Sequence, residues 1–142
     1  MPNVVVRVAL AYLAVAGLFP GVWATVAPRN FYDDFPGGGL RWVAAEPPYN
    51  EHLVRDVGAF FLALGILALV AAILSNVTLA RVTGAVWLVF SIPHLAFHVR
   101  HLDRYDSAAL NVLALSLPIA AALVALVGPS RTRPPAGQPP PT

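Results

Sequence analysis

Apolar residues are concentrated in four stretches of the chain, separated by three more polar connections. Each stretch has about the 20 residues that a helix needs to cross roughly 30 Å of hydrocarbon. We therefore predict membrane-spanning helices at about residues 4–26, 53–75, 79–99 and 107–127. The second stretch is the clearest, because it contains the uncharged run VGAFFLALGILALVAAIL. The pattern predicts an all-α integral membrane protein, folded as an antiparallel four-helix bundle.

The first stretch also has an alternative interpretation as a cleaved signal peptide. Arg7 would supply the basic region, and small residues near position 27 would precede a cleavage site. However, Arg7 lies inside the apolar run, which continues past Pro20 for several residues. These features favour a spanning helix.

Helices in lipid associate through small residues, because lipid supplies no hydrophobic force between them and close backbone approach requires small side chains. The second stretch carries four such residues on its central part. The predicted packing residues are Gly58, Ala59, Ala63 and Gly65.

The connection over residues 27–52 is the longest in the chain and is rich in aromatic residues. It also contains the glycine triplet 37–39 and two prolines at 47–48, which interrupt regular structure. Aromatic rings with one polar edge favour the headgroup layer, so we predict a loop that caps one end of the bundle. The transmembrane domain is predicted over residues 1–128, and the proline-rich end, residues 129–142, is predicted to be disordered.

Composition supports a membrane protein and narrows its partners. Hydrophobic residues make up 58% of the chain, charged residues 11%, and the mean hydropathy is +0.69, whereas soluble domains are roughly 45–50% apolar and 25% charged. The absence of cysteine excludes disulfides and thiolate metal sites. Arginines scattered singly offer no basic patch for nucleic acid. The expected partners are the lipid bilayer and either other membrane proteins or a second copy of the chain.

Four spans place both termini on one side of the membrane, and the acidic residues on the other. Arg7 and Arg81 mark the terminal side. By net charge this favours a multi-pass protein of the cell membrane with cytoplasmic termini. A count of arginines alone does not favour it, because the opposite side carries five of them, at positions 29, 41, 55, 100 and 104. All the acidic residues fall on the opposite side: Asp33, Asp34, Glu46, Glu51, Asp56, Asp103 and Asp106.

All four histidines lie at the same acidic end of the predicted bundle. His94, His98 and His101 share one face at the end of the third helix, and His52 and Asp56 are likewise four residues apart on the second. Ionisable groups in a span normally face the bundle interior and pair with one another. We therefore predict that the two sets meet in one His/carboxylate site near the acidic face, with Asn111 about one turn further in on the fourth helix.

Two chemistries suit such a site. A transition metal such as Zn, Fe or Cu is compatible with imidazole and carboxylate ligands. A His beside a carboxylate can instead transfer protons to or from a lipophilic substrate. The candidate metal ligands are His52, Asp56, His94, His98 and His101. The candidate catalytic residues are Glu51, His52, Asp56 and His94.

Two resemblances accompany these patterns. The H-x-x-x-H-x-x-H spacing of residues 94–101 is similar to one histidine box of the membrane-bound desaturases and hydroxylases, which use several such boxes where this chain has one. The run PYNEHLVRDVG, residues 48–58, together with chain length and span count, resembles the small four-helix DoxX-like membrane proteins of the actinobacterial type. The second resemblance implies architecture and no activity.

Three classes of function fit the sequence. The first is a membrane protein with a metal-binding or acid–base site at one membrane face, acting on a lipophilic substrate. The alternative is an accessory or assembly subunit of a larger membrane complex, with no chemistry of its own. A transporter is the weakest of the three, because three of the predicted helices carry almost no ionisable residues at mid-depth to line a path.

Overall fold

The computed structural model describes residues 1–129, so the predicted disordered end lies outside the described residues apart from its first position. The described chain is helical and contains no strand. Its elements are α1 (Val4–Val26), α2 (Pro28–Asp34), α3 (Glu51–Leu74), α4 (Val77–Arg100), the 3₁₀-helix η1 (Leu102–Arg104) and α5 (Ala108–Val127). The helices α1, α3, α4 and α5 are each long and apolar enough to cross a membrane. The predicted all-α bundle of four spans is confirmed.

Asparagine side chains set the start of three spanning helices. The side chains of Asn3, Asn50 and Asn76 each accept a hydrogen bond from a backbone N–H three residues later, at 2.9, 3.1 and 3.0 Å respectively. This cap satisfies one of the amide groups that a helix leaves free in its first turn. It explains why α3 and α4 each begin two residues before the apolar stretch that predicted them.

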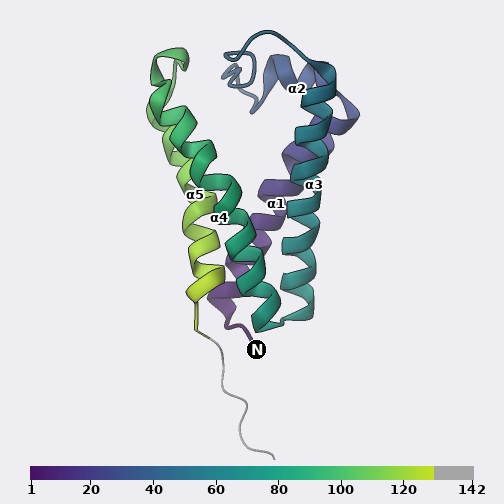
Figure 1. The fold of residues 1–142 in the computed structure, drawn as a ribbon, viewed down its shortest axis with the longest axis vertical. Helices are drawn as coiled ribbons and strands as arrows, with labels where there is room; N and C mark the ends of the chain where they lie inside the picture. The colour runs from purple at the N-terminus through teal and green to yellow at the C-terminus, as the bar shows by residue number, and fades with distance from the viewer. Residues whose placement is uncertain (130–142) are drawn as a thin grey trace, which may run out of the picture.

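The helix α2 lies in the segment predicted as an irregular capping loop. Pro28 occupies its first turn, where a missing N–H costs no hydrogen bond. Two of its three buried residues, Phe31 and Tyr32, pack with Val54 of α3. The segment does cap one end of the bundle (Figure 1), but part of it is helical because an apolar face is available to bury.

Close backbone approach joins α1 to α3. A Cβ atom added at Gly17 would lie 2.6 Å from the Cα of Gly65, and one at Gly58 would lie 2.8 Å from the Cβ of Ala24. Real Cβ atoms do not come so near other atoms, so only glycine fits at these points. We call α1 and α3 the first pair.

The helices α4 and α5 form the second pair in the same way. A Cβ atom at Gly84 would lie 2.5 Å from the carbonyl oxygen of Ala122. Figure 1 shows the two pairs side by side at the end where the chain begins, and diverging toward the end that carries α2. The bundle is therefore open at the α2 end.

The main core lies where the two pairs meet. Leu10 and Leu13 of α1, Leu64 of α3, Trp87 of α4 and Ala122 of α5 are all buried in it. The Trp87 indole N–H donates to the Leu64 carbonyl oxygen at 3.3 Å and so links the pairs.

The two ends of the described chain lie together at this side of the bundle. The Asn3 backbone N–H donates to the Pro129 carbonyl oxygen at 3.4 Å. This contact agrees with four spans that begin and end on one side.

The predicted packing residues of α3 are half right. Gly58 and Gly65 are buried against α1, whereas Ala59 and Ala63 are exposed. Ala59 follows Gly58 by about 100° around the helix, which turns its side chain away from α1. Being small does not by itself place a residue at the interface.

We predict that Gly65→Leu lowers the free energy of unfolding in detergent by about 1–3 kcal/mol or more, because the new side chain must push the α1 backbone away. The matched variant Ala63→Leu, on the exposed face of the same helix, should change it by less than about 0.5 kcal/mol. Both are measured by SDS titration followed by circular dichroism. Equal losses in the two variants would contradict the described α1–α3 contact.

Candidate functional site

A cavity of about 670 Å³ lies between the two pairs, on the α2 side of the core. Its lining comes from all five α-helices and from the loop between α2 and α3. Trp87 belongs both to the core and to the lining, so it stands where the packed part of the bundle gives way to the cavity. Aromatic side chains form a large part of the walls, among them Phe19, Phe31, Trp42, Phe61, Phe90 and Phe97.

The loop between α2 and α3 is tied to the connection between α4 and α5. The Trp42 indole N–H donates to Ser107 Oγ at 3.2 Å. The Glu46 carboxylate accepts one hydrogen bond from the Tyr105 hydroxyl at 3.0 Å and another from Arg104. These contacts join the first pair to the second at the open end of the bundle. Because Trp42 and Glu46 also line the cavity, the loop forms its outer wall.

Tyr105 is held as a hydrogen-bond donor. Burial, and next the hydrogen bond to Glu46, raise the pKa of the Tyr105 phenol above its ordinary value. The phenol therefore stays protonated at neutral pH and keeps its bond to Glu46.

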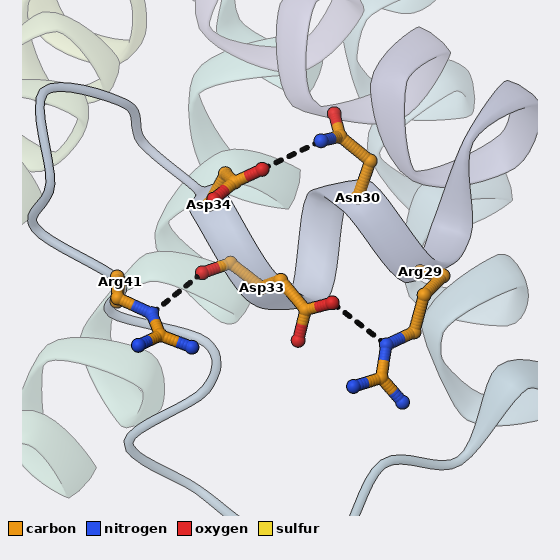
Figure 2. A network of polar contacts seen from close by, with 5 residues as sticks. All are labelled: Arg29, Asn30, Asp33, Asp34 and Arg41. Carbon is orange, nitrogen blue, oxygen red and sulfur yellow. Dashed lines mark hydrogen bonds and ion pairs between the residues drawn. The ribbon is translucent and has the colours of Figure 1, made fainter.

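The outer face of α2 satisfies its own polar groups. Figure 2 shows Arg29 Nε donating to Asp33 at 2.7 Å, Asn30 Nδ2 donating to Asp34 at 2.6 Å, and Arg41 Nε donating to the Asp33 carbonyl oxygen at 3.0 Å. The inner face of the same helix supplies apolar lining to the cavity. The carboxylates of α2 are thus part of the surface, and Arg41 fixes the returning loop to it.

Polar lining within the cavity is concentrated on α4. Ser91, His94 and His98 follow one another at intervals of three and four residues, so they share a helix face. The His94 ring stacks on Phe90 with centroids 5.0 Å apart and meets His98 edge-on at 4.7 Å. The His98 ring in turn stacks on Tyr105 at 4.8 Å. This polar stripe runs from the core toward the loop.

Several buried polar atoms of this region have no hydrogen-bond partner within residues 1–129. They are Ser91 Oγ, His98 Nδ1, and both amide atoms of Asn111 on α5. Ser91 is 4% exposed and Asn111 is fully buried. The Asn111 amide lies within hydrogen-bonding reach of His98, although the relative orientation of the two groups is outside the limits of a well-formed hydrogen bond. Unpaired buried polar groups of this kind are rare in folded proteins and each one calls for an explanation.

The structure places the predicted α3 residues outside the cavity. His52 and Asp56 pair with each other at 3.2 Å, with side chains 88% and 63% exposed. Glu51 is also exposed and bonds Arg55 at 2.9 Å. The predicted convergence of these residues with His94 and His98 is therefore not formed. The cause is helix rotation: the buried residue Val54 is two positions from both His52 and Asp56, which is about 200° around the axis.

Of the three α4 histidines, two reach the cavity. His94 and His98 line it, whereas His101 ends the helix and its Nδ1 lies 2.8 Å from the Phe97 carbonyl oxygen. Within the part of the chain that the structure describes, no three His, Asp or Glu side chains are grouped to hold a metal ion. The predicted five-residue metal set is thus divided between the outer surface of α3 and the α4 stripe, and metal binding is not supported.

Ser91 is absent from the predicted site because the prediction considered histidines, carboxylates and one amide, and no hydroxyl groups. Trp87, Ser91, His94 and His98 are separated by four, three and four residues, which is the spacing of a single helix face. Reading every polar residue on that face would have extended the stripe inward to Ser91. No sequence signal indicates that Glu46 and Tyr105, 59 positions apart, close the outer wall together.

The fold and the site define a class of protein: a multi-pass membrane protein with a ligand-sized cavity between two helix pairs. Comparisons with protein-family models, with curated proteins and with solved structures find no match for this chain. The four-helix architecture implied by the DoxX-like resemblance is present, and no comparison supports membership of that family.

We predict that Asn111→Val raises the free energy of unfolding by about 1 kcal/mol, because it removes buried amide atoms that have no partner. Asn76→Val should do the opposite and lower it by about 1 kcal/mol, since the Asn76 side chain caps α4. SDS titration followed by circular dichroism measures both. A loss of stability in Asn111→Val as large as in Asn76→Val would mean that the amide is hydrogen-bonded in the protein.

Proposed function

We propose that this membrane protein binds a lipophilic small molecule, with at least one hydrogen-bonding group, in the cavity between its two helix pairs. The observation that carries the proposal is the combination of a ligand-sized aromatic cavity with unpartnered polar atoms beside one of its walls. Cavities of about 300–1,000 Å³ that are mostly apolar and hold a few polar groups are typical of small-molecule sites.

Energetics support binding as the reason for this arrangement. Each buried polar atom without a partner costs about 1–3 kcal/mol, and an apolar side chain at the same position would avoid that cost. The walls of an open cavity also lose the dispersion contacts that packed side chains would provide. Ser91 Oγ makes no hydrogen bond within the described residues, so an apolar side chain at that position would serve the bundle equally well. A ligand that bonds to the unpartnered polar atoms accounts for both features.

The proposed activity is binding of the small molecule, in which the histidines act as hydrogen-bonding groups. His94 and His98 supply two imidazoles to the cavity, whereas zinc sites use three or four protein ligands. Acid–base catalysis on the bound molecule is an extension of the proposal, and it would fall to His94 and His98. The roles predicted for Glu51, His52 and Asp56 stay predictions from the sequence, as does the accessory-subunit alternative.

A cavity-filling substitution tests the proposal. Ala114 of α5 lines the cavity, and Ala120 of the same helix is exposed on its outside. We predict that wild-type protein, purified from its membrane in mild detergent, carries a lipophilic compound that organic extraction and mass spectrometry detect. Ala114→Phe should reduce the amount per protein at least about tenfold, while Ala120→Phe leaves it unchanged.

Either of two results would contradict the proposed binding site. If no compound co-purifies with the wild type beyond what empty micelles carry, or if Ala114→Phe and Ala120→Phe retain the same amount, the cavity is not the binding site. The helical content of each variant, measured by circular dichroism, serves as the control for folding.

We also propose that the termini are cytoplasmic and that the cavity faces the other side of the membrane. The support is net charge: Arg7 and Arg81 lie at the terminal end of the bundle with no acidic residue beside them, whereas the loop end carries every acidic residue together with five arginines. The chain has no cysteine, so single cysteines report unambiguously. In intact cells an impermeant maleimide should label Asp103→Cys and leave Thr78→Cys unlabelled until the cells are opened. The reverse pattern would invert the orientation.

A further inference from the structure

The charge and shape of the cavity narrow the class of ligand further, an inference that rests on the proposed function. We propose that the cavity takes an uncharged ring compound bearing a hydroxyl or carbonyl oxygen, which the Ser91 hydroxyl and the His98 ring bind by hydrogen bonds. Three properties of the lining carry this inference: its formal charges, its ring content, and the position of its free polar atoms.

The lining contains no formal charge that is free to bind a charged headgroup. No arginine lines the cavity, and the chain contains no lysine. The one carboxylate of the lining, Glu46, is already bonded to Arg104 and Tyr105. A phosphate or carboxylate drawn into the cavity would lose its water without gaining a cationic partner, and burying an unpaired charge is strongly unfavourable. Lipids with charged headgroups are therefore poor occupants.

The walls favour a ring over a flexible chain. Ring side chains line the cavity from α1, α2, α3, α4 and the loop. Phe61 of α3 and Phe90 of α4 meet edge-on at 5.0 Å, and the stack from Phe90 to His94 continues the row of rings along α4. Aromatic pairs in offset or edge-on contact gain stability beyond simple burial of area. A rigid ring also loses less conformational freedom on binding than an acyl chain does.

The polar side chains of the α4 wall specify oxygen on that ring. Ser91 and His98 line the cavity, and Ser91 Oγ and His98 Nδ1 are buried without a partner in the described residues, so a change of side-chain rotamer is needed to turn each atom toward a ligand. The Ser91 hydroxyl can donate one hydrogen bond and accept up to two, and His98 Nδ1 donates or accepts according to its tautomer. A ligand hydroxyl or carbonyl can pair with either of them. Ser91 and His98 lie about 10 Å apart along the axis of α4, given the helical rise per residue. Each can therefore contact a different part of one ring compound.

Four probes separate ring, oxygen and charge. They are 2-naphthol, naphthalene, 2-naphthoate and 1-decanol, and each is partitioned by ultrafiltration between buffer and protein in lipid nanodiscs, with empty nanodiscs as the reference. We expect excess binding in the order 2-naphthol, then naphthalene, then decanol, with none for the anionic naphthoate. The preference for naphthol over naphthalene should be about threefold to tenfold, which is the effect of one hydrogen bond.

Matched variants locate the oxygen. Ser91→Ala should reduce the preference for naphthol over naphthalene without lowering the stability of the protein, because Ser91 Oγ has no partner within the described residues. His98→Phe keeps a ring at that position and should also reduce the preference, because the single naphthol hydroxyl pairs with one of the two groups in one pose and with the other in a second pose. The double variant should bring the preference near unity. Ser116→Ala, which removes a hydroxyl bonded within α5, and His52→Ala on the outer face of α3 should leave it unchanged.

Each contrary outcome overturns a stated part of the inference. Equal binding of naphthol and naphthalene, or a preference unaffected by Ser91→Ala and by His98→Phe, removes the hydrogen-bonded oxygen. Tighter binding of naphthoate removes the neutral class, and binding of decanol as tight as naphthol removes the ring. These results leave the proposed binding function in place if Ala114→Phe still releases the co-purified compound. No excess binding of any probe overturns the ligand class as a whole.

Discussion

Close approach of helix backbones at glycine is the constraint on which the rest of this structure depends. In lipid, apolar side chains gain nothing by leaving their surroundings, so helices adhere where their backbones can come close enough for dense packing. Gly17, Gly58 and Gly65 provide such contacts between α1 and α3, and Gly84 provides them between α4 and α5. The bundle therefore consists of two tight pairs, and part of the space between the pairs is a cavity.

The two pairs meet fully only at the end where the chain begins. There the core around Leu10, Leu13 and Trp87 fills the space between them. Beyond Trp87 the pairs diverge, and side chains from both border the cavity (Figure 1). At the open end, polar contacts of the loop connect the two pairs, since Glu46 bonds to both Arg104 and Tyr105. Tight packing at one end and a polar connection at the other thus produce a cavity in a chain of 142 residues.

Sequence patterns predicted the helices because membrane spans depend on properties of the local chain. Length and apolar content determine a span, and caps such as Asn50 and Asn76 determine where it starts. The rotation of each helix about its own axis cannot be predicted from the local chain in this way, because it depends on which face meets a neighbouring helix. His94 and His98 were predicted and do line the cavity, whereas His52 and Asp56 share a face of α3 that points outward.

The remaining part of the site depends on contacts between distant segments, which no local pattern contains. Asn111 is buried beside His98 because α5 packs on α4. Glu46 of the loop reaches Tyr105 because the fold brings these two segments, 59 residues apart in the chain, to the same end of the bundle. The expected lipid bilayer agrees with the four apolar spans. Protein partners or a second copy of the chain remain predictions from the sequence.

The central claim, that the pairs diverge around a cavity, is tested most directly by distances between spin labels on α3 and α4 in nanodiscs. Introduced cysteines are unique in this chain. Labels at Leu69 and Val82 report the closed end, and labels at His52 and Val99 report the open end; all four side chains are exposed. We expect double electron–electron resonance to give a clearly longer distance at the open end, with a single narrow distribution at the closed end. Equal distances at the two ends would mean parallel helices without the cavity, and would contradict this account.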